Sequence, residues 1–285
     1  MNSNKRKEIL ERFDASSDVV DELAVFFANT FSSCTKDLND SFLDKWKSVF
    51  MCAGIDGAAK AINQFLVKRE REITFESPES VEIELYSSIG GDIPVITAKN
   101  NTDFDSILRN AVYNGKDDSN ILKMGAAFAF GKQTRFIVLS YKPYANIPAE
   151  YMGFDEETWA ENSLLIRKHH ECAHYFTKRF YGSSKNNLHD ELLADLSGFY
   201  SAFGKFKAEW FLHGLGLLDN PDGKEGRIAI YTKGLGDKSV KIVARLAAVI
   251  ARSVEKWTET NEFLDMTEIG RLSSLCEKEM LDWVC

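Results

Sequence analysis

The chain has 285 residues and a formal net charge of −8, and 44% of its residues are hydrophobic. This composition excludes a disordered chain, and the acidic balance without a basic stripe argues against nucleic-acid binding. Five cysteines at irregular spacing do not form a disulfide framework, no apolar stretch is long enough to span a membrane, and no secretory signal is present. We therefore expect a cytoplasmic protein.

The first 72 residues are predicted to be a helical region. Apolar residues recur there at helical spacing, beginning after Ser17, which we expect to cap the first stripe. The stripes are Val20, Leu23, Ala24 and Phe27, then Phe42, Trp46 and Phe50, then Ala58, Ile62, Phe65 and Leu66. The charged run 68–72 is interpreted as a solvated helix end, and a domain boundary is placed at residue 72.

A small sheet is predicted within residues 73–142. Residues 81–86 alternate apolar and polar, Gly90 and Gly91 form a turn, and residues 93–97 return as the second strand of a hairpin. A short helix is expected at 104–112. The strand at 135–141 places Phe136, Val138 and Ser140 on one face and Ile137, Leu139 and Tyr141 on the other. Strands near it could present an edge to an extended peptide.

After a proline-containing loop at 142–154, one long helix is predicted from 155 to 181. It carries His170-Glu171-Cys172-Ala173-His174, the H-E-x-x-H zinc pattern. Residues four apart lie on one helical face, about 5–6 Å apart at Cβ, so the two imidazoles can bind one Zn²⁺. Glu171 then lies where a general base is needed.

The next predicted helix, reaching to about Phe203, supplies the rest of a zinc site. A catalytic zinc takes three protein ligands, and the carboxylate of Glu191 completes a set of two histidines and one glutamate. Asp195, one turn later, could accept a hydrogen bond from the outward N–H of a ligating histidine. The short turn at 183–187 makes the two helices antiparallel neighbours.

The combination of H-E-x-x-H with E-x-x-A-D at 191–195 resembles the gluzincins, the zinc metallopeptidases that pair the first motif with a downstream glutamate. It looks most like their prenyl-protein protease and heat-shock protease branch. The resemblance covers roughly residues 157–200. It implies an α+β zincin-like core, the zinc ligands His170, His174 and Glu191, the base Glu171 and the supporting residue Asp195. Because the chain lacks that branch's membrane spans, a membrane substrate is not implied.

Other interpretations of these residues stay open. His189 could replace Glu191 as the third ligand, although it lies at the helix start and has no acid four residues later. The metzincin pattern needs a histidine where Phe180 stands. His169 points about 100° away from His170 on a helix, and Cys172 also faces away from the ligands. Two satisfied, buried histidines without metal are the alternative to a zinc site.

We therefore predict a zinc-dependent metallopeptidase acting on a peptide or protein substrate. A zinc hydrolase of a non-peptide amide and a catalytically silent regulatory protein are the alternatives. An oxyanion donor is expected among His213, Tyr200 and Tyr231, and spacing does not choose among them. The glycine-rich segment 215–238, with a possible strand at 228–231, and the loop 142–154 are candidate lids. Helices at 238–258 and 267–284 end the chain.

Overall fold

The structure is a computed structural model, and it describes residues 1–13, 15–31, 36–116, 121–131, 134–182 and 187–284. The chain divides into two compact units: residues 1–36 with 177–285, and residues 37–176. The boundary predicted at residue 72 lies inside the second unit, because the helices before it pack on the sheet. No helix in the described ranges is long and apolar enough to cross a membrane.

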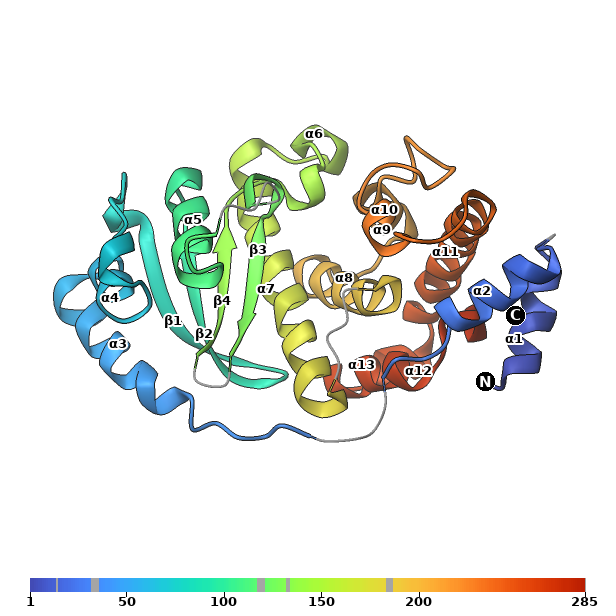
Figure 1. Cartoon of the computed structure of the whole chain (residues 1–285), viewed down its shortest axis with the longest axis horizontal. Helices are drawn as coiled ribbons and strands as arrows, with labels where there is room; N and C mark the ends of the chain where they lie inside the picture. Colours follow the sequence, from blue (N-terminus) through green and yellow to red (C-terminus); the bar gives the residue numbers. More distant parts are fainter. Residues whose placement is uncertain (14, 32–35, 117–120, 132–133, 183–186, 285) are drawn as a thin grey trace. The chain divides into compact units, whose positions relative to one another are not determined.

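The unit of residues 37–176 is built on a four-stranded mixed sheet, so the fold is α+β as expected (Figure 1). Its strands are β1 (Val81–Ser88), β2 (Gly91–Ala98), β3 (Ala126–Phe130) and β4 (Arg135–Ser140), in the order β1-β2-β4-β3. The hairpin β1–β2 is antiparallel, β2 and β4 are parallel, and β3 and β4 are antiparallel. The predicted hairpin is confirmed.

Helices cover both faces of this sheet. One face packs on α3 (Leu43–Asp56), α4 (Ala58–Phe65) and α5 (Asn101–Ile107), and Phe136 and Val138 point to it. Ile137 and Leu139 face the opposite side, where Cys172 and Tyr175 of α7 (Glu156–Tyr181) complete the core. The alternation predicted for this strand is confirmed, because successive side chains of a strand point to opposite faces.

The strand order determines which strands lie at the edges of the sheet. The strand at 135–141 does not itself offer the peptide-binding edge expected near it, because β4 lies between β2 and β3 and has neighbours on both sides. The edge strands are β1 and β3. The sequence pattern missed β3 because Ala126–Phe130 is uniformly apolar and does not alternate. At the other edge, the hairpin turn packs closely on α7: a Cβ at Gly90 would lie 2.7 Å from Tyr175 Cδ1.

The other unit is helical, and its N-terminal and C-terminal segments pack together. It contains α1 (Ser3–Glu11), α2 (Ser17–Phe26), α8 (Leu188–Phe203), α9 (Ala208–Leu215), α10 (Ile228–Tyr231), α11 (Asp237–Thr258), α12 (Asn261–Asp265) and α13 (Glu268–Glu277). The strand predicted at 228–231 is wrong, since this segment is the helical turn α10. The helix predicted at 267–284 ends at Glu277, and a short 3₁₀ turn (Met280–Trp283) follows. The cap of α2 is Ser16 rather than Ser17.

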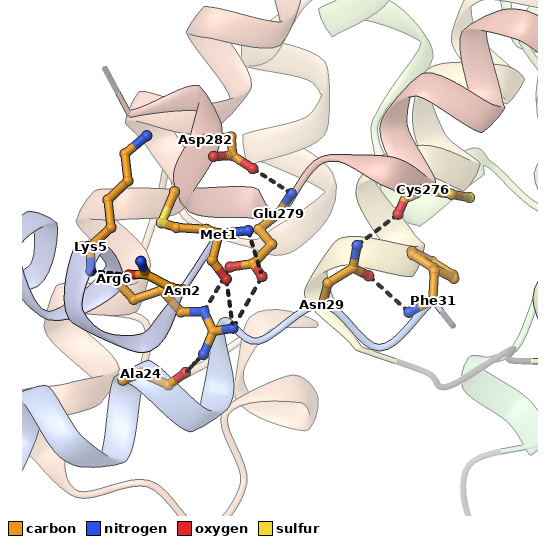
Figure 2. A network of polar contacts seen from close by, with 10 residues as sticks. All are labelled: Met1, Asn2, Lys5, Arg6, Ala24, Asn29, Phe31, Cys276, Glu279 and Asp282. Atoms are coloured by element: carbon orange, nitrogen blue, oxygen red, sulfur yellow. Dashed lines mark hydrogen bonds and ion pairs between the residues drawn. The ribbon is translucent and has the colours of Figure 1, made fainter. Parts of the chain in front are cut away.

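A polar network joins the beginning of the chain to its end (Figure 2). The Glu279 carboxylate accepts hydrogen bonds from Arg6 Nε at 2.7 Å and from the Met1 ammonium at 3.2 Å. Its own backbone amide donates to Asp282 at 2.8 Å, and Asn29 Nδ2 donates to the Cys276 carbonyl at 2.8 Å. These contacts fasten α1 and the segment after α2 to the C-terminal segment.

Candidate metal centre

Two helices carry the motif residues, and local sequence fixes where each begins and ends. Helix α7 has Glu156 and Glu157 in its first turn and Lys178 and Arg179 in its last, which complements the helix dipole. Helix α8 begins after Asn187, whose side chain caps the Asp190 amide at 3.0 Å, and ends at a left-handed Gly204. The predicted bounds of 155–181 and about 203 are confirmed within a residue.

The three predicted metal ligands form one group. His170, His174 and Glu191 each offer one ligand atom, and these atoms all lie within 4.8 Å of one another. The Nε2 atoms of the two histidines are 3.1 Å apart. Two nitrogen ligands at about 2.0–2.1 Å from a tetrahedral zinc lie roughly 3.3 Å apart, so the pair fits one ion. Among the described residues no other group of this kind occurs, and this group could hold a metal ion.

A buried tyrosine fixes the orientation of the first histidine. Tyr144 Oη lies 2.9 Å from His170 Nδ1, and both side chains are buried. When Nε2 offers its lone pair to a metal, Nδ1 carries the proton and donates it to the tyrosine oxygen. Sequence reasoning missed Tyr144, because it lies 26 residues before His170 and only the fold brings the two together.

The segment that holds Tyr144 is tied to α7 by side chains spaced four residues apart. The Tyr144 amide donates to Ser163 Oγ at 2.9 Å, and Trp159 Nε1 donates to the Ile147 carbonyl at 2.7 Å. Arg167 donates to the carbonyls of Lys142 and Pro143. Trp159, Ser163 and Arg167 thus form one ridge of α7, which positions the tyrosine over the histidine one turn later.

Arg167 also brings a buried cation close to the motif. Burial lowers the pKa of its guanidinium to about 10, while the nearby Tyr144 and Glu171 act to raise it. Arg167 therefore remains charged at neutral pH. The space for it depends on a glycine, since a Cβ at Gly125 would overlap with Arg167 Nε. Glu171 itself is half-buried, so its carboxylate is within reach of solvent.

Two residues, Arg227 and Tyr231, contact the carboxylates of α8 and are called the Arg227–Tyr231 clamp below. Arg227 Nη2 lies 2.6 Å from Asp195 Oδ2 and 3.6 Å from Glu191 Oε2. Four residues later, the Tyr231 hydroxyl hydrogen-bonds to Glu191. Burial, the largest cause, raises the pKa of this hydroxyl well above its ordinary value although Arg227 acts to lower it, so Tyr231 is a protonated donor. Asp195 is fully buried, and its predicted hydrogen bond to a ligating histidine stays a prediction.

A protein-family model matches residues 57–133 and 131–284, which is most of the chain. The chain belongs to that family. It is described as a family of unknown function (DUF7005). No curated protein matches the chain, and no solved structure does. The matched residues of this DUF7005 member include the sheet, both motif helices and the Arg227–Tyr231 clamp.

The remaining candidates lie in packed surroundings. His189 is buried, its Nε2 donates to the Leu275 carbonyl at 2.9 Å, and burial lowers its pKa, so it is a core histidine outside the ligand group. Tyr200 packs edge-on against Phe263. Cys172 is buried under the sheet and His169 lies 3.4 Å from Tyr86 Oη, and both therefore face away from the ligands as expected.

Among the oxyanion candidates, Tyr231 contacts the predicted ligand Glu191. Its neighbour Arg227 was missed. The spacing of Arg227 and Tyr231 matches that of Glu191 and Asp195, and this i, i+4 pairing is a signal that the sequence did contain.

Proposed function

We propose that the protein is a zinc-dependent metallopeptidase of the gluzincin type, with a zincin-like core formed by the sheet and α7. The observation that carries the proposal is the grouping of His170, His174 and Glu191, whose ligand atoms lie within 4.8 Å of one another beside the potential base Glu171. A closed structural zinc site has four protein ligands, whereas three leave a position open for water and substrate.

In this proposal, His170, His174 and Glu191 hold the ion. Zinc supplies Lewis acidity, which makes water more acidic and polarises a substrate carbonyl. Tyr144 keeps His170 in the tautomer that presents Nε2, and Arg227 with Tyr231 keeps the Glu191 carboxylate in place.

Glu171 performs the proton transfers. Its carboxylate accepts a proton from the attacking water and then delivers it to the nitrogen of the departing amine. Tyr231 is the favoured donor to the carbonyl oxygen as negative charge develops there, because its hydroxyl is protonated and already lies beside Glu191.

The segments predicted as lids supply these contacts. Residues 142–154 carry Tyr144 and residues 215–238 carry Arg227 and Tyr231. Their contacts with the motif residues support the expectation that they border the site. We propose that they limit entry to extended or flexible peptide chains.

The test compares hydrolysis by two glutamine variants. Wild type, Glu171→Gln and the control Glu161→Gln, which changes an exposed glutamate of the same helix, are loaded with zinc and incubated with an unfolded protein library. New peptide termini are then read by mass spectrometry. We expect cleavage by wild type and Glu161→Gln, and at least a hundredfold loss in Glu171→Gln with zinc retained.

Equal cleavage by all three proteins would remove Glu171 from the mechanism. Zinc binding without cleavage by any of them would favour the silent regulatory protein. Zinc-dependent release of an amine from small acylated amides, with peptides untouched, would favour the amidase instead.

A further inference from the structure

Strand β1 has an open edge. It is an outer strand of the sheet, paired with β2 on one side, and the described residues place no strand on its other side. All eight residues of β1 are in register with β2, from Val81 opposite Ala98 to Ser88 opposite Gly91. An edge this long and regular is a template for another strand.

The hydrogen-bond pattern shows which residues offer their backbone groups outward. The Lys99 amide donates to the Ser80 carbonyl, so alternate residues from Ser80 onward bond to β2. Val81, Ile83 and Leu85 are the intervening residues, and their amides and carbonyls face away from β2. Leu85 lies opposite Pro94, which has no amide hydrogen to donate, and this agrees with backbone groups of Leu85 that face away from β2.

A groove of about 720 Å³ runs along this edge, between helices on the two faces of the sheet. On one side its wall is apolar and low, formed by Phe50, Ala53 and Gly54 of α3. On the other side it is bordered by Leu164 and Lys168 of α7. A chain lying against β1 would therefore send alternate side chains towards α3 and towards α7.

The charged residues that line the groove indicate which side chains a bound strand would carry towards α7. Val81 and Ile83 pack on the side of α3 and α4, so Glu82 and Glu84 project towards α7, where Glu84 pairs with Lys168 at 2.6 Å. With Glu79, the lining holds three carboxylates and one ammonium. Cross-strand pairs of opposite charge stabilise a sheet, and like-charged pairs destabilise it.

We propose that this groove binds an extended peptide segment of a partner protein by strand addition to β1, and that the segment alternates apolar and basic residues. Its apolar side chains contact Phe50 and Ala53, and its basic ones pair with Glu82 and Glu84. A second copy of the chain fits poorly, because two β1 strands side by side would bring their own glutamates together. The proposal does not depend on the metal site.

The test is a binding titration with three fluorescent peptides. Each has eight residues, the length of β1, and they alternate valine with lysine, alternate valine with glutamate, or carry the lysines and valines in two blocks. Anisotropy is measured on the full chain carrying Glu171→Gln, so that a peptidase would not consume the probe. We expect the alternating lysine peptide to bind at least about tenfold more tightly than the other two.

Two variants locate the binding. A Cβ at Gly54 meets nothing within 4 Å, so Gly54→Leu introduces an apolar side chain that starts in open space at the groove. Ser48→Leu on an exposed part of α3 is its control. Glu82→Lys reverses the charge, with exposed Glu262→Lys as its control. We expect about a tenfold loss of affinity in Gly54→Leu and in Glu82→Lys and none in the controls.

Amide exchange should also slow at Val81, Ile83 and Leu85 when the peptide binds. Equal affinity for lysine and glutamate peptides, or unchanged binding in Gly54→Leu, would overturn the proposal. Complete absence of binding would do so too, and would mean that the glutamates only protect the edge from aggregation.

Discussion

Replacing Tyr144 with phenylalanine removes one hydroxyl and tests how the metal site is built. The ring is buried, with 4% of its surface exposed, and phenylalanine preserves its packing. What disappears is the 2.9 Å contact with His170 Nδ1, which leaves a buried N–H without its acceptor. Loss of such a supporting contact typically lowers metal affinity about 10–100-fold, or about 1.4–2.7 kcal/mol.

The assay is a zinc titration of the apo protein against a competing fluorescent chelator. The matched control is Tyr86→Phe, which removes the hydroxyl lying 3.4 Å from His169 Nε2, a histidine outside the ligand group. We expect the dissociation constant for zinc to rise for Tyr144→Phe alone, with the melting temperature little changed. Equal affinities in wild type and Tyr144→Phe, or an equal loss in both variants, would refute the role of Tyr144.

Three further outcomes follow from the contacts. Asp195→Ala should weaken zinc binding about 10–100-fold in the same titration, and an unchanged dissociation constant would limit Asp195 to pairing with Arg227. Arg167→Met should free the segment around Tyr144, seen as faster amide exchange there, and unchanged exchange would contradict this. Burial raises the pKa of Glu279, but bonds from Arg6 and the Met1 ammonium outweigh it and lower the pKa. The charged Glu279 should therefore stabilise the fold fully above the ordinary carboxyl pKa of 4.5, and this stabilisation should be lost as the pH falls through the lower pKa of the folded protein. In urea unfolding, the free energy of unfolding of Glu279→Gln should be about 1 kcal/mol below that of wild type at pH 7, and the difference should disappear in acid.

The helices that carry the motif could be predicted because their signals are local. In the structure, the cap at Asn187 and the left-handed glycines at 182 and 204 lie next to the helix ends, so the residues that set these ends are close to them in the sequence. The grouping of Glu191 with the two histidines was expected from the spacing of the motifs, and the ligand atoms of the three residues lie within 4.8 Å of one another.

The remaining features depend on contacts between distant residues. Ile228–Tyr231 is rich in residues that favour strands, but Arg227 and Tyr231 contact carboxylates one helical turn apart, and a helical turn provides that spacing. Tyr144 lies in a proline-containing segment with no periodic pattern, and its role arises from the ridge of α7 that holds it. The edge position of β1 rather than β4 is a property of strand order, which periodicity does not encode.

The most direct test of the central claim is zinc K-edge X-ray absorption of the full chain purified without chelators and loaded with zinc. We expect one ion per chain, with two imidazole nitrogens at about 2.0–2.1 Å, a carboxylate oxygen at a similar distance and no sulfur. In Glu191→Ala the protein oxygen should be lost while both imidazoles remain. A protein that takes up no zinc, or that binds it through sulfur at about 2.3 Å, would contradict the assignment of His170, His174 and Glu191.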